Sequence, residues 1–190
     1  MAKGVEKMTG SLITQKKIAK VFKQLVIEIG FEKVTIAKIM LASGMRRQTF
    51  YDYFQDKYEL VDWIFRQEAI EKIEDNLAYE GWEIIVENLL KYFEENQVFY
   101  RKVLFFDGQN SFQEYYTRHL EALIHQVLVL KKIENEEVEQ SDHQFLEEFY
   151  ANAFVTLTIK WLLSGCKVSA ELFARKMKLA FLMGFEEKTK

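Results

Sequence analysis

The sequence contains no proline and one cysteine, and each of these features restricts what the chain can be. Without proline, and with only eight glycines among 190 residues, few positions interrupt a helix. The single cysteine, Cys166, excludes an internal disulfide framework and a cysteine-based zinc site within one chain, so a reducing cytoplasm is the expected location. The first residues contain no long apolar stretch, so we expect neither a signal peptide nor a membrane span.

Signatures of catalysis are missing as well. His119 and His125 are six residues apart, so they do not share the helical face that an i, i+4 metal pair needs. The sequence has no glycine-rich phosphate loop and no serine or cysteine within a local catalytic signature. Cys166 is interpreted as a structural cysteine rather than a reactive thiol. We therefore expect a protein that is not an enzyme and that holds neither a metal nor a cofactor.

The apolar residues that are present indicate helices. They make up 49% of the chain and recur at steps of three and four, and no alternating run is bounded by hairpin turns. The predicted fold class is therefore all-α. A chain of this length can bury a sizeable core in one domain or in two closely packed ones.

The charges are separated along the chain. Residues 1–57 carry eleven Lys or Arg and five Asp or Glu, a net +6, whereas the remaining residues carry a net −9. A basic segment is attracted to phosphates, and an acidic body limits nonspecific binding. An uneven solvated surface is the alternative interpretation of the same charges.

Residues 11–29 are predicted to form the first helix, with Ser11 or Thr14 as its cap and Gly30 just past its end. Its lysines, among them Lys23, lie largely away from the apolar stripe. We interpret them as solvated, and those near the start of the helix would add sequence-independent attraction to a DNA backbone.

Two short helices joined by Ser43-Gly44 are predicted next. Thr35 caps the first, which runs to about Ala42, and the glycine turn lets the second cross it at a steep angle. The second begins at Met45 or Arg46. Such a pair of helices places one of them where it can enter a groove of DNA.

The second of these helices has two different faces. Phe50, Tyr53 and Phe54 share one face by their i, i+3 and i+4 spacing, with Met45 at the entry to the same core. The opposite face offers groups that read a duplex, since Arg donates two hydrogen bonds to guanine, Gln pairs with adenine and a Thr methyl contacts thymine. We therefore predict a helix that reads the major groove.

The run from Thr35 to Leu60 resembles the N-terminal domain of TetR-family transcription regulators. It matches their small-residue-glycine turn, their recognition helix, here Thr49-Phe-Tyr-Asp-Tyr-Phe54, and their Lys-x-x-Leu entry to the next helix. The resemblance covers about residues 11–60. It implies a three-helix helix-turn-helix domain at residues 1–58 and a helical regulatory and dimerisation domain at residues 59–190.

The resemblance also implies which residues touch DNA. Arg47, Gln48 and Thr49 would face bases, and the other residues of the set would touch or approach the backbone. The whole predicted set is Thr35, Arg46, Arg47, Gln48, Thr49, Tyr51, Tyr53 and Lys57. Gln48 stands where the family often has glycine and Arg46 where a small hydroxyl residue often caps the helix, so the DNA sequence that is recognised does not follow from the family.

Further helices are predicted along the rest of the chain. A linking helix is expected over 57–78, followed by helices after Gly81, from Val98 to Phe106 and after a capping box at Ser111. Lys131 to Asp142 is expected to be an exposed connection, and Ser141 is predicted to begin a second capping box. Five aromatic residues either pack as core, the favoured interpretation, or line an effector pocket. They are Phe105, Phe106, Phe112, Tyr115 and Tyr116.

The last two predicted helices suit a twofold interface. Residues 145–164 are strongly apolar and end at Gly165, and Ser169 caps a final amphipathic helix. In a homodimer four such helices would form a bundle. The predicted dimer-interface residues are Phe149, Ala153, Leu157, Trp161, Leu172, Phe173, Met177 and Phe181.

The C-terminal half is similar to the TetR subgroup that activates dihydroxyacetone kinase operons, in Asn96-Gln-Val-Phe-Tyr100, Phe149-Tyr150 and the stretch from Trp161 to Leu172. That similarity implies an activator whose partners are double-stranded DNA with an imperfect palindrome, a second copy of the chain, and a coactivator protein related to a kinase subunit. Two alternatives stay open. One is a repressor gated by a small molecule, and the other is a helical interaction module that does not bind DNA.

Overall fold

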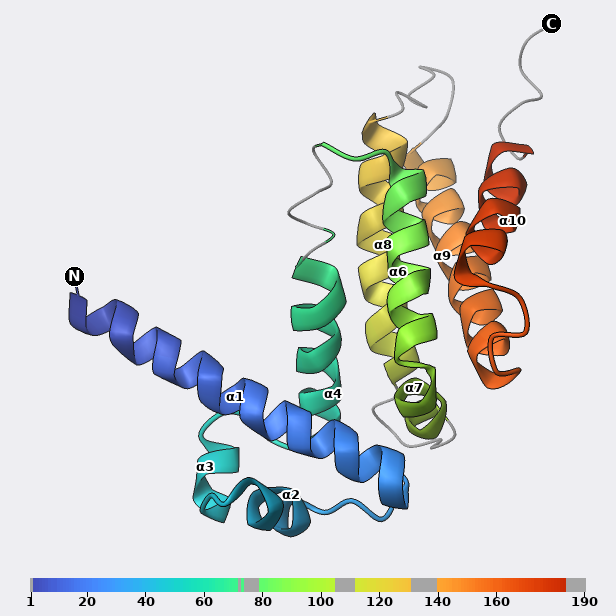
Figure 1. Cartoon of the computed structure of the whole chain (residues 1–190). Helices are drawn as coiled ribbons and strands as arrows, with labels where there is room; N and C mark the ends of the chain where they lie inside the picture. The colour runs from blue at the N-terminus through green and yellow to red at the C-terminus, as the bar shows by residue number, and fades with distance from the viewer. Residues whose placement is uncertain (1, 72, 74–78, 105–111, 131–139, 184–190) are drawn as a thin grey trace, which may run out of the picture.

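The computed structural model describes residues 2–71, 73, 79–104, 112–130 and 140–183, and in these ranges the chain is helical without strands. Figure 1 shows two parts, a head built from α1, α2 and α3, and an upright bundle that contains α6, α8, α9 and α10. Helix α4 rises from the head and runs beside the bundle. The predicted all-α class is confirmed.

Helix α1 (Ala2–Ile29) crosses the top of the head and supplies its longest apolar face. Ile18, Phe22 and Val26 are completely buried, as their spacing predicts. The helix starts earlier than predicted, so Ser11 and Thr14 lie inside it and do not cap it. Gly30 follows with a φ of 87°, a left-handed conformation that glycine adopts without steric cost.

Helix α4 (Lys57–Phe65) begins at Asp56, whose carboxylate accepts hydrogen bonds from the backbone N–H groups of Tyr58 and Glu59 at 2.8 and 2.9 Å. The predicted linking helix does not remain α-helical, because Arg66–Ile70 (η1) form one π-helical turn in which the N–H of Glu71 donates to the carbonyl of Arg66. A π-turn carries one extra residue and rotates the side chains that follow it. Apolar periodicity does not predict such a turn.

The body contains α6 (Trp82–Glu95), α7 (Gln97–Leu104), α8 (Phe112–Leu130), α9 (Gln140–Leu163) and α10 (Ala170–Met183). Helix α8 packs against α9 and α6 packs against α10, while the short α7 lies at the foot of the bundle and contacts α1 (Figure 1). Gly165 has a φ of 83° after α9, and Ser169 Oγ accepts from the N–H of Leu172 at 3.3 Å, which confirms both predicted boundaries.

One other predicted helix boundary differs in the structure, and the remaining ones lie outside the described residues. Ser141 is already inside α9, because that helix starts at Gln140, so it is not the N-cap. The predicted turn and cap at residues 107–111 and most of the connection over 131–142 lie outside the described residues.

The aromatic residues of the body form core around Phe65, whose side chain is fully buried. Its ring lies 5.5 Å from Phe93, 5.2 Å from Phe112 and 5.6 Å from Tyr116, measured between ring centroids. Phe112 and Tyr116 are therefore core residues, and Tyr115 packs partly buried against them. Phe105 and Phe106 lie outside the described residues.

Three of the predicted dimer-interface residues are buried within their own chain. Trp161, Met177 and Phe181 expose 5%, 3% and 3% of their surfaces. Helix α10 packs against α6, the Phe181 ring lies 4.8 Å from Trp82 and 4.7 Å from Tyr150, and the Trp161 ring is stacked 5.0 Å from Phe173. They stabilise the protomer and present almost no surface to a second copy, and their predicted place in a dimer interface stays a prediction. Periodicity identified an apolar face but could not show that the same chain covers it.

We predict that Phe65→Ala destabilises the chain by about 3 to 5 kcal/mol, because it removes a large buried ring and leaves a cavity among rings that cannot close around it. Urea unfolding followed by circular dichroism at one protein concentration measures the change. Leu41→Ala is the control, since Leu41 is 82% exposed and its truncation should change the unfolding free energy by less than about 0.5 kcal/mol. Equal effects of the two substitutions would show that the core is not organised around Phe65.

Candidate nucleic-acid interface

The turn between α2 (Ile36–Ser43) and α3 (Arg47–Tyr51) fixes how the recognition helix is presented. Gly44 has a φ of 67°, its N–H donates to the carbonyl of Leu41 at 3.1 Å, and the N–H of Met45 donates to the carbonyl of Met40 at 3.0 Å. This left-handed C-terminal motif requires a residue without a Cβ penalty, which glycine supplies. The predicted Ser43-Gly44 turn is confirmed.

Thr35 caps α2 as predicted. Its backbone is extended, and its side-chain oxygen accepts from the N–H of Lys38 at 3.3 Å. Arg46 occupies the equivalent position before α3, and its side chain makes no capping hydrogen bond. Arg46 stands where a small hydroxyl residue often caps this helix in the family that the sequence resembles. It is exposed at the start of α3.

The inward face of α3 rests on the core of the head. Phe50 is fully buried and Phe54 exposes only 2%, with Tyr53 and Met45 partly buried against them. Their ring centroids are 5.5 Å apart for Phe50 and Phe54, and Phe54 is 5.7 Å from Trp63 of α4. This packing confirms the predicted buried face and holds a helix of one and a half turns that could not persist alone.

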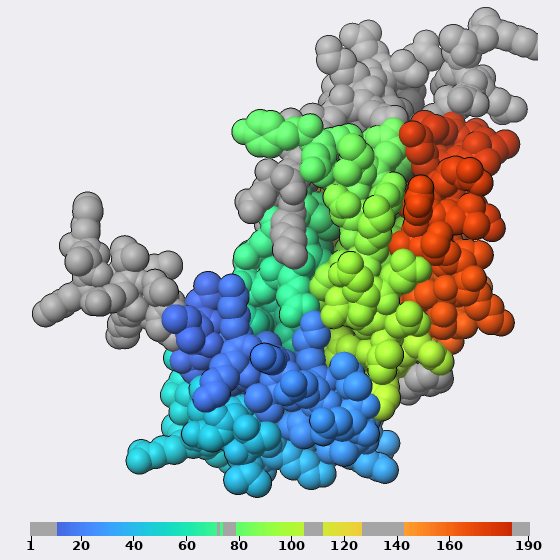
Figure 2. Space-filling model, in the orientation of Figure 1, coloured from blue at the N-terminus to red at the C-terminus, as the bar shows by residue number. Residues whose placement is uncertain are grey.

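The outward face carries the predicted DNA-reading residues. Arg46, Arg47, Gln48 and Tyr51 are exposed and Thr49 is half-buried. Arg47 Nη2 donates to the Tyr51 hydroxyl at 3.0 Å. Figure 2 shows the α2–α3 region at the lower edge of the molecule, where the bundle does not cover it.

Lys57 has a structural role that sequence reasoning missed. Its ammonium lies 2.9 Å from the carbonyl oxygen of Phe31, 3.2 Å from that of Val34 and 4.4 Å from the centroid of the Phe31 ring. A third carbonyl, that of Glu32, is 3.4 Å away, and burial lowers the pKa of Lys57. In the free chain the three donors of the ammonium are thus directed at the turn after α1, whereas the implied phosphate contact stays a prediction.

A polar cluster joins the head to the body. Lys23 of α1 donates to Glu68 of η1 at 2.6 Å and to Asn96, after α6, at 2.9 Å. The Tyr92 hydroxyl donates to the same Glu68 carboxylate at 2.9 Å and lies 2.7 Å from the Tyr100 hydroxyl. The interpretation of Lys23 as a solvated lysine was therefore wrong. Its partners are 45 and 73 residues away in sequence, and nothing in a local pattern indicates them.

Asp62 lies on α4, and its pKa differs from the ordinary value of an aspartate. Burial raises its pKa to about 7, opposed by the charge of Arg118 and reinforced by Asp56 and Glu59. The folded chain therefore holds a proton on Asp62 more firmly than the unfolded chain does. Its ionisation opposes folding at neutral pH.

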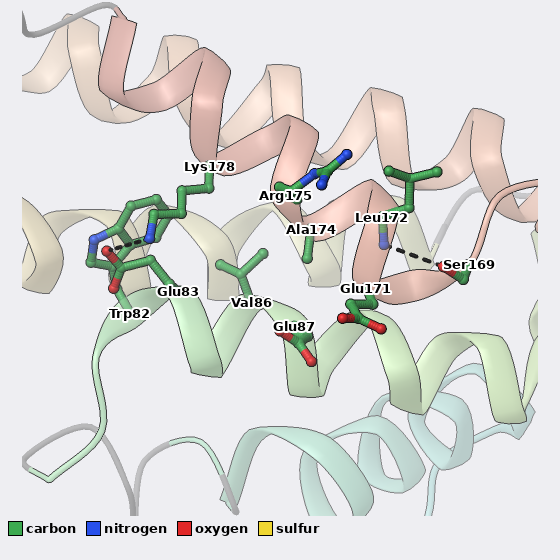
Figure 3. A pocket seen from close by; sticks show the side chains of 10 residues that line it. All are labelled: Trp82, Glu83, Val86, Glu87, Ser169, Glu171, Leu172, Ala174, Arg175 and Lys178. Atoms are coloured by element: carbon green, nitrogen blue, oxygen red, sulfur yellow. Dashed lines mark hydrogen bonds and ion pairs between the residues drawn. The ribbon is translucent and has the colours of Figure 1, made fainter.

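A groove between α6 and α10 has a volume of about 330 Å³ (Figure 3), and a second groove between η1 and α6 has a volume of about 310 Å³. Trp82, Val86 and Leu172 form apolar parts of the wall of the first groove, and Lys178 and Glu83 pair across it at 3.5 Å. By contrast, the cavity between η1, α6 and α8, beside Tyr116 and His119, measures only about 40 Å³.

Among the residues that the structure describes, no three His, Cys, Asp or Glu side chains gather where they could hold a metal ion. Within the same ranges, no helix is long and apolar enough to cross a membrane. Burial raises the pKa of the Cys166 thiol to about 11, which lowers the reactivity of that thiol.

Comparison with known proteins identifies the family. Residues 20–64 match the model described as bacterial regulatory proteins, tetR family, and residues 80–181 match one described as a transcriptional regulator C-terminal region. The second match spans more than half of the chain. The chain therefore belongs to the TetR family of bacterial transcription regulators, whose first domain contains the helix-turn-helix described above.

The chain is also similar to an individual transcription regulator. The chain is 40% identical over 121 residues to the HTH-type dhaKLM operon transcriptional activator DhaS of Lactococcus lactis subsp. lactis (strain IL1403), which is 64% of this chain and 64% of that protein. The matched region thus spans less than two thirds of that relative.

Solved structures of related chains agree with the fold. A structure described as dihydroxyacetone kinase operon activator DhaS covers 92% of this chain and 97% of its own, with 31% identity and a TM-score of 0.75. The fatty acid degradation regulator FadR from Bacillus halodurans, at 17% identity, 91% and 96% coverage and a TM-score of 0.64, shares the fold.

We predict that Asp62→Asn changes how stability depends on pH. Because the folded-state pKa is raised, Asp62 favours folding below its unfolded pKa and loses that contribution as pH rises towards about 7. We expect the unfolding free energy of the variant minus that of the wild type to increase from pH 4 to pH 7 and then to level off. Both free energies are measured in urea at one protein concentration. A difference that stays constant across this range would show that Asp62 ionises normally in the folded chain.

Proposed function

We propose that this TetR-family regulator binds an imperfect DNA palindrome as a homodimer and activates a dihydroxyacetone kinase operon together with a coactivator protein. The observation that carries the DNA-binding part is the exposed polar and basic face of α3, held on a buried base of Phe50 and Phe54. A helix fixed in this way can enter a major groove without ordering itself first.

The contacts divide into two kinds. We propose that Arg47, Gln48 and Thr49 face base edges, where Arg pairs best with guanine and Gln with adenine. Thr35 and Tyr53 would contact the phosphate backbone beside the groove, with Arg46 adding charge at the start of α3. The net +6 of residues 1–57 supports this division, since phosphate contacts need positive charge while the acidic body does not attract DNA.

Exposed apolar residues on α9 support the dimer. Phe149 and Leu157, both in the predicted set, are 54% and 45% exposed, and Phe145 is 65% exposed with its ring stacked 6.2 Å from that of Phe149. Ala153 is partly exposed between them on α9. On α10, Leu172 and Phe173 are partly buried, while Leu179 and Met183 are 58% and 65% exposed. Large exposed side chains of this kind mark an interaction surface.

In such a dimer the two recognition helices would enter successive major grooves about 34 Å apart, or a multiple of that distance. The regulatory and dimerisation functions would then belong to residues 59–190, and reading of DNA to residues 1–58. Because α4 lies within the one core that the head and the body share, this boundary falls inside a continuous packed region.

The activating role and the coactivator are supported by two observations. The relatives at 40% and 31% identity are described as activators of this type of operon. In addition, the cavity of about 40 Å³ between η1, α6 and α8 has room for a water molecule or little more, whereas small-molecule sites measure roughly 300 to 1,000 Å³. The two hollows that reach this size, of about 330 and 310 Å³, are open grooves at the surface and not cavities within the core. A filled core favours a signal that arrives on the surface through another protein.

A reporter experiment tests the activating role. The promoter of a dihydroxyacetone kinase operon from the same genome is fused to a reporter in a host that lacks related genes, with this chain alone, with the kinase-related candidate coactivator alone, and with both. We expect transcription to rise only when both are present. A decrease caused by this chain alone, relieved by a small molecule, would instead establish a repressor.

We predict that Arg47→Ala weakens binding to the specific site by about tenfold to a hundredfold, the effect of losing a bidentate contact with guanine worth roughly 1 to 3 kcal/mol. Binding to unrelated duplexes should change much less. Gel-shift titration at fixed salt measures both, with Lys38→Ala, an exposed charge on α2, as the control for loss of a positive charge. Equal losses on specific and unrelated DNA would assign Arg47 to the backbone.

We predict that Phe149→Glu, alone or combined with Leu157→Glu, converts the dimer to monomer by placing charge in an apolar interface. Size-exclusion chromatography with light scattering gives the mass in solution. Ile13→Glu is the matched control, because Ile13 is 64% exposed on α1, which belongs to the head and packs against α2 and α7. A dimer that survives both substitutions on α9 would place the interface elsewhere.

A further inference from the structure

We propose that Tyr51 positions the guanidinium of Arg47 and thereby determines how sharply the protein discriminates between DNA sequences. The family resemblance implies only a backbone contact for Tyr51. This inference rests on the proposed DNA-binding function, and it concerns the residue that orients the base-reading group.

The two side chains meet on the exposed face of α3. Arg47 opens the helix and Tyr51 closes it, an i, i+4 spacing that places one above the other. Arg47 Nη2 donates to the Tyr51 hydroxyl oxygen at 3.0 Å, and the guanidinium carbon lies 5.7 Å from the centroid of the Tyr51 ring. Both a hydrogen bond and a cation–π contact thus hold the guanidinium before DNA is present.

Tyr51 can orient its partner because its own ring is supported. The ring packs edge-on against Phe50, with centroids 5.7 Å apart and planes at 81°, and Phe50 is fully buried in the head. The rigid core therefore constrains the Tyr51 ring, although that residue is 43% exposed. Through Tyr51, this constraint extends to the end of the long Arg47 side chain.

Such a constraint matters for reading a base. A guanidinium pairs with guanine through two parallel hydrogen bonds, so its plane must have one orientation. A free Arg side chain loses rotamer freedom when it adopts that orientation, and part of this freedom is already lost in the contact with Tyr51. The contact between Tyr51 and Arg47 consequently strengthens binding most on duplexes that place guanine opposite Arg47.

The Tyr51 hydroxyl can still donate a hydrogen bond. A phenol has one donor and two acceptor positions, and Arg47 uses an acceptor position. The O–H group can still donate to a phosphate oxygen, which would join a backbone contact to the orientation of Arg47. A contact with phosphate alone, without this coupling, predicts a different result when the hydroxyl is removed.

The test is a double-mutant cycle of Tyr51→Phe and Arg47→Ala in the full-length chain. The probes are a duplex spanning the footprint that the unmodified chain leaves on its own promoter region, and variants of that duplex changed at single base pairs. Tyr51→Phe should weaken binding to the footprinted duplex about threefold to tenfold, the net effect of one solvent-accessible hydrogen bond. It should lower the discrimination against one of the single-base variants by a similar factor.

In the Arg47→Ala background, Tyr51→Phe should weaken binding by a clearly smaller factor, equal for all duplexes, because the group that it positions is gone and only a phosphate contact can remain. Tyr53→Phe is the comparison for a phenol hydroxyl that contacts phosphate only, so it should weaken binding to all duplexes by one factor, with or without Arg47. Circular dichroism verifies that each variant is folded. Comparison across the duplexes separates the two roles, since loss of a phosphate contact alone lowers affinity for all duplexes equally.

The proposal is overturned if Tyr51→Phe weakens binding by the same factor with and without Arg47, or if discrimination is unchanged. Either result leaves the proposed DNA-binding function intact, because the footprint would still exist. If the unmodified chain leaves no footprint and no duplex is bound specifically, the proposed function itself fails before the cycle begins.

Discussion

The packing of Phe65 is the contact on which the arrangement of this protein depends. Helix α4 has only nine residues, yet Leu60 and Ile64 are fully buried along it and Phe65 is enclosed by rings from α6, α7 and α8. The head and the body thus share one continuous core, and this short helix lies within it. Because a close-packed core does not deform continuously, the head cannot rotate relative to the body unless these rings repack.

Immediately after Phe65 the backbone changes to a π-turn, and this turn carries Glu68 to Lys23 of the head. The pair is partly exposed, and Asn96 and Tyr92 complete its hydrogen bonds from the body. An apolar contact and a polar cluster thus connect the same two parts, within a few residues of each other.

Local features of the site could be predicted from sequence. The Thr35 cap, the left-handed Gly44 and the burial of Phe50 and Phe54 each follow from residues within one or two helical turns, where backbone preferences and periodicity decide the conformation. Family membership then agreed with the interpretation of this segment.

What could not be predicted depends on distant partners. The amphipathic pattern identified the apolar faces of α9 and α10 but not that they cover Trp161 and Phe181 within one chain. Lys23 and Lys57 looked like solvated or DNA-facing charges, because their carboxylate and carbonyl partners are more than twenty residues away. The Arg47–Tyr51 contact lies within one turn of α3, yet a sequence does not show which way two exposed side chains turn.

The central claim is that α3 reads DNA as one of a symmetric pair. The most direct measurement is selection of duplexes from a random-sequence library by the purified full-length chain, followed by sequencing of the bound fraction. The account predicts enrichment of an imperfect palindrome with half-site centres about 34 Å apart, or a multiple of that distance, and loss of the enrichment with Arg47→Ala. No enriched sequence, or an enriched sequence that Arg47→Ala selects equally well, would contradict it.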